Sequence, residues 1–402
     1  MTIEIRFAAS VDELRTGMAA GTRGFGDELL DDDFERHSKT MAPDRFLTAY
    51  DGAAPVGAAA SYPFTLTIPG GEVPAAGVTW VAVLPTHRRR GILTQFMRRQ
   101  LDDVHERGEP IAILWASEAA IYGRFGYGVA APTLMMNADR ARFAFRDDAG
   151  AVGAVRILDT TEANALLPPL HEQVRRQIPG MIARSAETWS TYRFADPERW
   201  RRGAGPKFFA VYERDGAPEG YAQYRIKEDW DEGFSRAELR VHEAFGVTPA
   251  ATREVWRFLF GIDLIVRVSG SLDPGSPLFL SVVDPRSLHL RLGEGLWLRL
   301  VDVETALRAR SYVGDDAVVL DVRDDVCAWN AGRYRVGSTV ERTDAGADLA
   351  LDVADLASVY LGAFDFHALA RAERVRELTP GAVDRASALF RTARPPFCSE
   401  DF

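Results

Sequence analysis

The stretch "LPTHRRRGILTQFMRRQL" occupies positions 84–101 and places four consecutive potential cations, His87 to Arg90, directly before a glycine. The chain as a whole carries a formal net charge of -10 at pH 7, so this run of positive charge is a local exception. Apolar residues then recur at spacings of three, four and seven, which predicts an amphipathic helix. Gly108 and Pro110 are expected to end that helix.

Buried strands are predicted on both sides of this helix. The run "GVTWVAVLP" (77–85) precedes it and the nearly all-apolar run "PIAILWAS" (110–117) follows it, an order typical of a βαβ unit. The backbone N–H groups around Arg89 to Leu93 then lie at a helix N-terminus, where they lack intrahelical partners and the helix dipole adds positive charge. Gly91 lets the backbone approach a ligand closely. The turn therefore suits a phosphate, and the flanking arginines strengthen it.

A solvated helix cap is the alternative, and it is disfavoured because cations at the positive end of a helix are electrostatically unfavourable. The spacing Arg88-x-x-Gly91-x-Leu93 is neither the dinucleotide-binding G-x-G-x-x-G pattern nor a P-loop. It resembles the R/Q-x-x-G-x-G/A pyrophosphate turn of the GNAT acyl-CoA N-acyltransferases, with Leu93 where that turn has glycine or alanine.

Length and composition are those of an ordinary soluble globular protein with two or three domains: 402 residues, 47% hydrophobic and 26% charged. No apolar run approaches the length of a membrane span and the N-terminus lacks a signal-peptide pattern, so we expect a cytoplasmic protein. The acidic balance argues against nucleic acid as a partner and favours a cationic small substrate. Two cysteines, and seven histidines without ligand spacing, predict neither a disulfide framework nor a metal site.

Three regions follow one another along the chain. Residues 1–150 have the strand and helix order of a GNAT domain. Residues 151–290 repeat that order, since "KFFAVYERDGAPEGYAQYRI" (207–226) matches "RFLTAYDGAAPVGAAASY" (45–62) in pattern, a chance echo being the alternative. This second copy has no arginine cluster before its helix, so we expect it to bind no CoA and to serve as structure. Residues 291–402 form an α+β unit followed by a tail.

Acyl transfer from a thioester to an amine benefits from an acid that protonates the departing thiolate, and a phenol with a pKa of about 10 can supply that proton. The segment "ASEAAIYGRFGYG" (116–128) follows the second strand of the βαβ unit, on the side where a CoA thioester should arrive. GNAT enzymes often carry Y-x-x-x-G-[FY], with the first tyrosine as the acid. Tyr122 occupies that position, and we expect Tyr127 to belong to the core.

Five features together resemble the Eis family of mycobacterial and actinobacterial acetyltransferases, and the likeness runs from end to end. They are "WVAVLPTHRRRGIL" (80–93), the tyrosine segment 116–128, "LWLRLVDVETALRAR" (296–310), "YLG" (360–362) and a C-terminal Phe. The resemblance implies acetyl-CoA-dependent N-acetylation of amines, notably at several positions of aminoglycoside antibiotics. It also implies two tandem GNAT-like regions, a C-terminal domain of sterol-carrier-like α+β fold, and a homohexamer.

The resemblance also assigns roles to single residues. Val81 and Val83 would bind the pantetheine through their main chains, and Ser117 would lie near the thioester. The pyrophosphate would be held by the turn residues Arg88, Arg89, Arg90, Gly91 and Ile92. Tyr122 would be the general acid, and the general base would be the free C-terminal carboxylate of Phe402. An α-carboxylate is ionised at pH 7 and can accept an ammonium proton directly or through water, although a frayed tail is the alternative for a C-terminal residue.

The amine acceptor is expected to meet an acidic pocket. Phe25 and Asp27 match an aromatic–aspartate pair of the family in "FGDELL", and Glu400 and Asp401 stand beside the terminal carboxylate. His37 replaces a tryptophan that the family can have there, and Asp401 replaces a glutamate. These departures affect the expected choice of amine acceptor and do not affect the predicted CoA-binding residues.

Two other functions compete with this interpretation. A protein-lysine or polyamine acetyltransferase would have a shallow cleft rather than an open acidic one. A non-catalytic acyl-CoA sensor and carrier of hydrophobic ligands would have a large apolar tunnel within residues 291–395.

Overall fold

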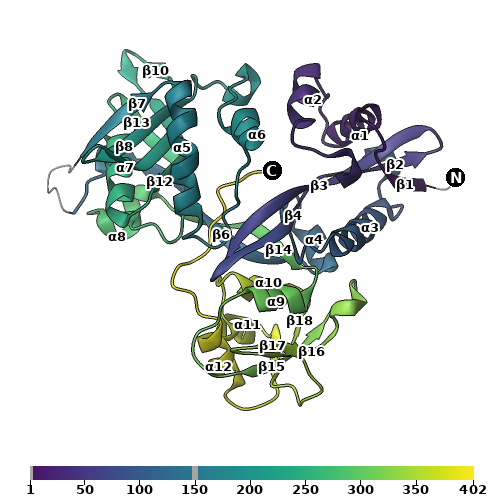
Figure 1. Cartoon of the computed structure of the whole chain (residues 1–402). Helices are drawn as coiled ribbons and strands as arrows, with labels where there is room; N and C mark the ends of the chain where they lie inside the picture. The colour runs from purple at the N-terminus through teal and green to yellow at the C-terminus, as the bar shows by residue number, and fades with distance from the viewer. Residues whose placement is uncertain (1–2, 147–152) are drawn as a thin grey trace. The chain divides into compact units, whose positions relative to one another are not determined.

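The computed structural model describes residues 3–146 and 153–402 (Figure 1). They fall into two compact units. The first unit contains residues 1–131, 295–393 and 400–402, and the second contains residues 132–294 and 394–399. None of the described helices is long and apolar enough to cross a membrane.

The N-terminal part of the first unit is a mixed sheet with helices on both faces. The strands lie in the order β1-β2-β3-β4-β5-β14. Their bounds are β1 Ile3–Phe7, β2 Phe46–Asp51, β3 Ala54–Ile68, β4 Gly71–Val83, β5 Ile111–Trp115 and β14 Arg291–Leu300. The helices are α1 (Val11–Gly24), α2 (Asp31–His37) and α3 (Ile92–Glu106). Helix α1 packs on the face of β3 that carries Ala58 and Ala60, and α3 packs on the opposite face, at Ala59 (Figure 1).

The predicted strand–turn–helix–strand unit is confirmed, since β4 and β5 are parallel and α3 connects them. The apolar stripe of α3 is buried at Phe96, Met97, Leu101 and Val104, while Leu93 is half-buried. Strand β14 follows the middle region in sequence, yet it returns to pair antiparallel with β5 through Leu296–Leu300.

The stretch "SVDELRTGMAAG" (10–21) predicts a helix with Ser10 as its N-cap and Gly21 as its stop, and helix α1 differs from this prediction at its end. Ser10 accepts a hydrogen bond from the Glu13 N–H, as expected for an N-cap. The predicted stop at Gly21 is wrong, because the helix continues to Gly24. Gly21 instead serves packing: a Cβ at this position would lie 3.1 Å from the Trp80 ring.

The C-terminal part of the first unit has its own five-stranded sheet, in the order β17-β16-β15-β18-β19. Its strands are β15 Val318–Arg323, β16 Gly332–Val336, β17 Val340–Arg342, β18 Leu349–Asp352 and β19 Val375–Glu377. Its helices are α9 Val303–Ala309, α10 Val353–Tyr360, α11 Phe366–Arg371 and α12 Ala382–Leu389. This is the α+β unit that the sequence predicts.

The second unit repeats the strand and helix order of the N-terminal sheet, as the internal echo predicts. Its sheet has the order β6-β13-β12-β9-β8-β7. The strands are β6 Gly128–Asp139, β7 Ala154–Leu158, β8 Phe208–Arg214, β9 Ala217–Lys227, β12 Ala237–Gly246 and β13 Ile265–Leu272, and a short hairpin joins β10 Trp230–Asp231 to β11 Phe234–Ser235. The helices are α5 Thr160–Arg175, α6 Ala186–Thr188, α7 Pro249–Gly261 and α8 Leu278–Ser281.

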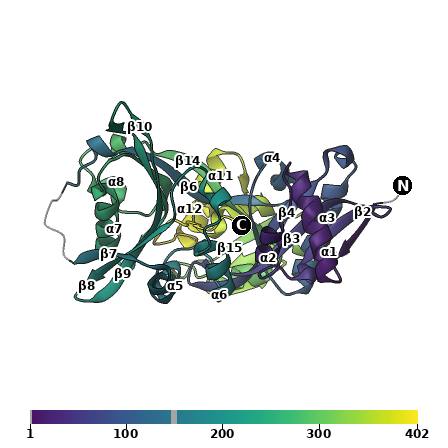
Figure 2. The ribbon, with the colours of Figure 1, turned by 90° about the horizontal axis from the view of Figure 1, so that it is seen from above.

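Helix α7 connects the parallel strands β12 and β13 in the way that α3 connects β4 and β5. Thr248 caps α7 by accepting from the Ala251 N–H, with Pro249 at the first helical position, so this turn is an ordinary helix start. Helices α5 and α7 cover opposite faces of the sheet (Figure 2).

The packing of α3 gives a direct stability test. Replacing Leu101, which is fully buried, with alanine should lower the free energy of unfolding by about 2–5 kcal/mol, because it removes buried methyl groups and leaves a cavity. The exposed Gln95 is the matched control on the same helix, and Gln95→Ala should change that free energy by less than about 0.5 kcal/mol. Urea denaturation followed by circular dichroism measures both, and equal losses would contradict the assigned orientation of the helix.

Candidate active site

The site begins where β4 and β5 part. The two strands pair only from Ala75 to Gly77 on β4 and from Ile111 to Ile113 on β5. Beyond these residues β4 continues to Val83 and β5 to Trp115, and the described chain has no ladder between the two ends. Peptide groups on the facing edges therefore lose the partner that a continuous sheet would give them, and an extended ligand chain can take its place.

A β-bulge shapes the free end of β4. Thr79 pairs with Ala60 and Ala82 pairs with Ala58, so Trp80 and Val81 together oppose one residue of β3. Trp80 has φ = 57°, which lies in the left-handed region. Val81 and Val83 are half-buried on this irregular end. Both residues that the family resemblance assigns to the pantetheine thus lie on the part of β4 that is not paired with β5.

The turn before α3 presents backbone donors. Gly91 is left-handed, with φ = 78°, and begins the helix without a side-chain cap. Arg89 is also left-handed, with φ = 63°. The first N–H groups of the helix point out of the turn without intrahelical partners, because helix geometry leaves them none. A Cβ at Gly91 would meet nothing within 4 Å, so the glycine is required by its backbone conformation rather than by lack of space.

Side chains of the turn contact two kinds of partner, a carboxylate and a main-chain carbonyl. His87 Nε2 lies 3.2 Å from Asp51 Oδ2, and Arg90 Nη1 lies 3.6 Å from the same oxygen. Arg88 donates through Nε to the Val83 carbonyl at 3.2 Å, which ties the turn to the end of β4. The side chains of Arg88, Arg89 and Arg90 are all exposed. Sequence reasoning did not single out Asp51, whose carboxylate lies beside His87 and Arg90; its local signal was the Asp51-Gly52 hairpin turn.

Tyr122 is the last residue of the short helix α4 (Ala119–Tyr122) and is 5% exposed. Burial raises the pKa of its phenol, the Ser117 hydroxyl opposes that shift through a hydrogen bond, and the charge of Glu118 adds to it. The phenol is therefore protonated at neutral pH and can donate a proton. Tyr127 lies in the core as predicted, with its ring centroid 6.0 Å from that of Tyr122, and burial raises the pKa of its phenol strongly.

The last residue of the chain packs where β4 and β5 part. The Phe402 ring lies edge-on to Phe64, with ring centroids 5.0 Å apart. A Cβ at Gly77 would lie 3.3 Å from Cε2 of Phe402. Glu400 is buried and Asp401 is exposed. The end of the tail is thus packed against the sheet rather than frayed.

The residues expected to meet the acceptor lie at different depths. His37 ends α2 and is half-buried, with its ring perpendicular to the Trp80 ring and the centroids 5.3 Å apart. Phe25 is 59% exposed just after α1. Asp27 is exposed, and its Oδ1 accepts from the Glu28 N–H at 2.8 Å. Sequence reasoning missed Trp80 as the aromatic neighbour of His37, because nothing in an apolar strand signals a left-handed bulge residue.

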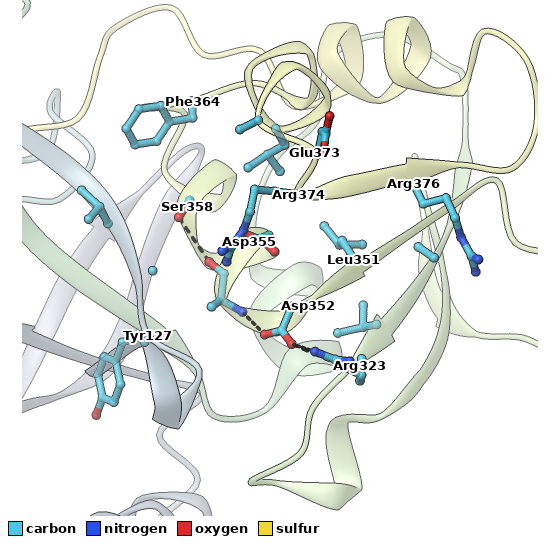
Figure 3. A pocket seen from close by; sticks show the side chains of 18 of the residues that line it. Tyr127, Arg323, Leu351, Asp352, Asp355, Ser358, Phe364, Glu373, Arg374 and Arg376 are labelled. Atoms are coloured by element: carbon cyan, nitrogen blue, oxygen red, sulfur yellow. Dashed lines mark hydrogen bonds and ion pairs between the residues drawn. The ribbon is translucent and has the colours of Figure 1, made fainter. Parts of the chain in front are cut away.

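A separate cavity of about 1250 Å³ opens within the first unit (Figure 3). Its wall includes Gly123, Tyr127 and Gly128, which follow Tyr122 in the chain. Two ion pairs also stand in the wall, Arg323 Nη2 3.2 Å from Asp352 Oδ2 and Arg374 Nε 2.8 Å from Asp355 Oδ1, among apolar side chains that include Val322, Leu351 and Leu369. The aromatic ring of Phe364 lies above and to the left of these pairs in Figure 3.

Three family models match the chain. Two are described as acetyltransferase (GNAT) domains and match residues 6–130 and 180–300. The third is described as a sterol carrier protein domain and matches residues 303–399. The predicted architecture of two GNAT-like regions followed by a sterol-carrier-like domain is confirmed.

Similar proteins cover nearly the whole chain. An uncharacterized N-acetyltransferase of Streptomyces avermitilis is 42% identical over 373 residues, which is 89% of this chain and 90% of the relative. The N-acetyltransferase Eis of Mycobacterium tuberculosis is 35% identical over 379 residues, which is 89% of each chain. The crystal structure of Eis1 from Mycobacterium abscessus superposes with a TM-score of 0.87 at 34% identity and covers all of both chains. This chain therefore belongs to the Eis family of GNAT N-acetyltransferases.

Proposed function

We propose that this enzyme transfers the acetyl group of acetyl-CoA directly to an amine of a cationic small molecule such as an aminoglycoside. Tyr122 acts as the general acid and the C-terminal carboxylate of Phe402 acts as the general base. The observation that carries the proposal is the packing of the last residue against Gly77, where β4 and β5 part. A chain end that serves no purpose would be expected to fray in solvent.

The coenzyme half of the proposal rests on the parted strands and the turn. A GNAT fold implies acetyl-CoA as the acyl donor. The main chains of Val81 and Val83 would bind the pantetheine, and Ser117 would lie near the thioester. The N–H groups from Arg89 to Ile92, with the exposed arginines around them, would hold the pyrophosphate at the helix N-terminus.

In the reaction the neutral amine attacks the thioester carbonyl carbon, so that the C–N bond forms while the C–S bond breaks. The amine loses a proton, which the terminal carboxylate accepts directly or through water; an α-carboxylate has a pKa of about 3.3–3.7 and is ionised at neutral pH. The CoA thiolate leaves and takes the phenolic proton of Tyr122. Both groups act only at the reacting atoms, so their loss should lower kcat more than coenzyme affinity.

The acceptor would approach from the side of the acids. Glu400 and Asp401 precede the carboxylate, and Phe25, Asp27 and His37 would form the outer wall. A polyamine or a protein lysine carries the same cationic amine and is the second candidate acceptor, in which case the reaction is unchanged. The homohexamer that the family resemblance implies and the cytoplasmic location expected from the sequence belong to this proposal as well.

A carrier of hydrophobic ligands has weaker support. The cavity within the first unit has ion pairs in its wall, between Arg323 and Asp352 and between Arg374 and Asp355. Burying a lipid chain against these charges would cost desolvation energy that an apolar tunnel avoids.

Tyr122→Phe tests the acid. The variant should lose about 10²- to 10⁴-fold in kcat, because the thiolate would leave without a positioned proton donor, while the Kd for CoA changes little. Thiol release from acetyl-CoA with an aminoglycoside and a polyamine measures the rate. Tyr127→Phe is the matched core control and should retain most of the activity. A fully active Tyr122→Phe variant would assign the acid to another group.

An extension of a few residues past Phe402 tests the base. It converts the terminal carboxylate to a neutral amide, so turnover should fall at least about 10²-fold. The same extension placed at the N-terminus is the control and should leave turnover unchanged. Full turnover by the C-terminally extended chain would move the base elsewhere.

Gly91→Ala tests the turn, with Gly108→Ala as its matched control at the other end of α3. Both glycines have positive φ and open space around a built Cβ, so each substitution should cost about 1–2 kcal/mol of stability by backbone strain alone. Only Gly91→Ala should weaken CoA binding, because only that strain displaces the N–H groups of the turn. Calorimetric titration with CoA measures this, and equal affinity for the two variants would exclude the turn as the pyrophosphate site.

A further inference from the structure

A buried ion pair contacts the turn of residues 122–126, which begins at Tyr122 and ends at Gly126. Arg299, on β14, places Nη2 2.6 Å from Oδ2 of Asp324, which follows β15. The two side chains are 0% and 1% exposed. Asp324 also accepts hydrogen bonds from the Cys327 N–H and from Asn330 Nδ2, at 2.9 and 3.0 Å. The carboxylate is thus held firmly, and it holds the guanidinium in turn.

The guanidinium of Arg299 rests against the turn itself. Gly126, which has φ = 81°, closes the turn by donating its N–H to the Gly123 carbonyl at 3.1 Å. A Cβ at Gly126 would lie 2.8 Å from both Cζ and Nε of Arg299. The Tyr127 N–H then donates to the Tyr122 carbonyl at 3.4 Å. Arg299 therefore fills the space directly behind the backbone that fixes Tyr122.

The contact continues through the side chains. The Tyr127 ring contacts the Tyr122 ring, at a centroid distance of 6.0 Å and an interplanar angle of 71°. The positive charge of Arg299 is close enough to Tyr127 to oppose the rise in its phenol pKa that burial causes. Arg299 therefore reaches Tyr122 by two routes, the Gly126 backbone and the Tyr127 ring.

Stability alone is a weak reason for such a pair. Burying two charges costs desolvation energy that their attraction often only offsets, and apolar side chains of similar volume are commonly neutral or stabilising in the same place. The guanidinium donates through Nη2 to Asp324 and through Nη1 to the Leu300 carbonyl at 2.9 Å, and these two hydrogen bonds give it a fixed geometry.

We infer that Arg299 and Asp324 are positioning residues for the general acid, so that β14 and the segment after β15 set the placement of Tyr122. This inference rests on the proposed role of Tyr122. It gives the C-terminal part of the first unit a task in catalysis beyond supplying the terminal carboxylate.

The test is a double-mutant cycle on the full-length chain. The neutral pair Arg299→Gln/Asp324→Asn keeps hydrogen-bonding groups and leaves no unpaired charge. In the native background it should lower kcat by about 10- to 100-fold, because a small misplacement of a catalytic group costs that much, while the KM for acetyl-CoA stays within about threefold. In the Tyr122→Phe background the same pair should lower kcat by less than about threefold.

A matched control is available in the same unit. Arg45 and Glu109 form another buried ion pair, with Nη2 2.5 Å from Oε1, at the opposite end of β5 from Tyr122. Arg45→Gln/Glu109→Gln should lower the melting temperature and leave the kcat of the folded enzyme within about twofold. If the first neutral pair reduces the folded yield, Arg299→Lys keeps the charge without the fork and should lower kcat by a smaller factor that again vanishes in the Tyr122→Phe background.

The outcomes distinguish the role of Tyr122 as general acid from the positioning role of Arg299 and Asp324. Suppose that Tyr122→Phe lowers kcat and that the neutral pair lowers it further by the same factor as in the native background. That result would overturn the positioning role and leave the role of Tyr122 intact. A native-like kcat for the folded neutral pair would overturn it as well. A fully active Tyr122→Phe variant would overturn the role of Tyr122, and the positioning role with it.

Discussion

The loss of backbone pairing between β4 and β5 beyond Gly77 is the constraint on which the rest of the site depends. Peptide groups that a continuous sheet would satisfy are left at two facing edges, and such groups are costly to bury without partners. The bulge at Trp80 and the hydrogen bond from Arg88 to the Val83 carbonyl hold one edge in this open form. The N-terminus of α3 lies at the end of the same edge, so donors for an extended chain and donors for phosphate come from one continuous piece of backbone.

The C-terminal region is built into this arrangement. Strand β14 pairs with the far side of β5 and thereby fixes the second edge. Arg299 on the same strand contacts the turn of Tyr122, and Phe402 packs against Gly77. Residues that follow position 290 therefore contact the site through β14 and through Phe402.

Sequence patterns predicted those elements whose structure depends mainly on residues close together in the chain. The βαβ unit, the buried stripe of α3, the core position of Tyr127 and the repeat in the middle region follow from periodicity and turn chemistry, and the structure confirms them. The stop predicted at Gly21 was wrong because tertiary packing against Trp80 outweighs the helix-breaking tendency of glycine. The Asp51 carboxylate beside His87, the left-handed Trp80 and the return of β14 to β5 depend on contacts between residues far apart in sequence, which periodicity cannot encode. The placement of Phe402 was expected only from the family resemblance.

A crystal structure of the enzyme with bound CoA tests the central claim most directly. The account predicts the pantetheine between β4 and β5, hydrogen-bonded to the main chains of Val81 and Val83, with the pyrophosphate over the N–H groups from Arg89 to Ile92. The sulfur should then lie within reach of the Tyr122 hydroxyl. A coenzyme bound elsewhere, or a sulfur remote from both Tyr122 and the Phe402 carboxylate, would contradict it.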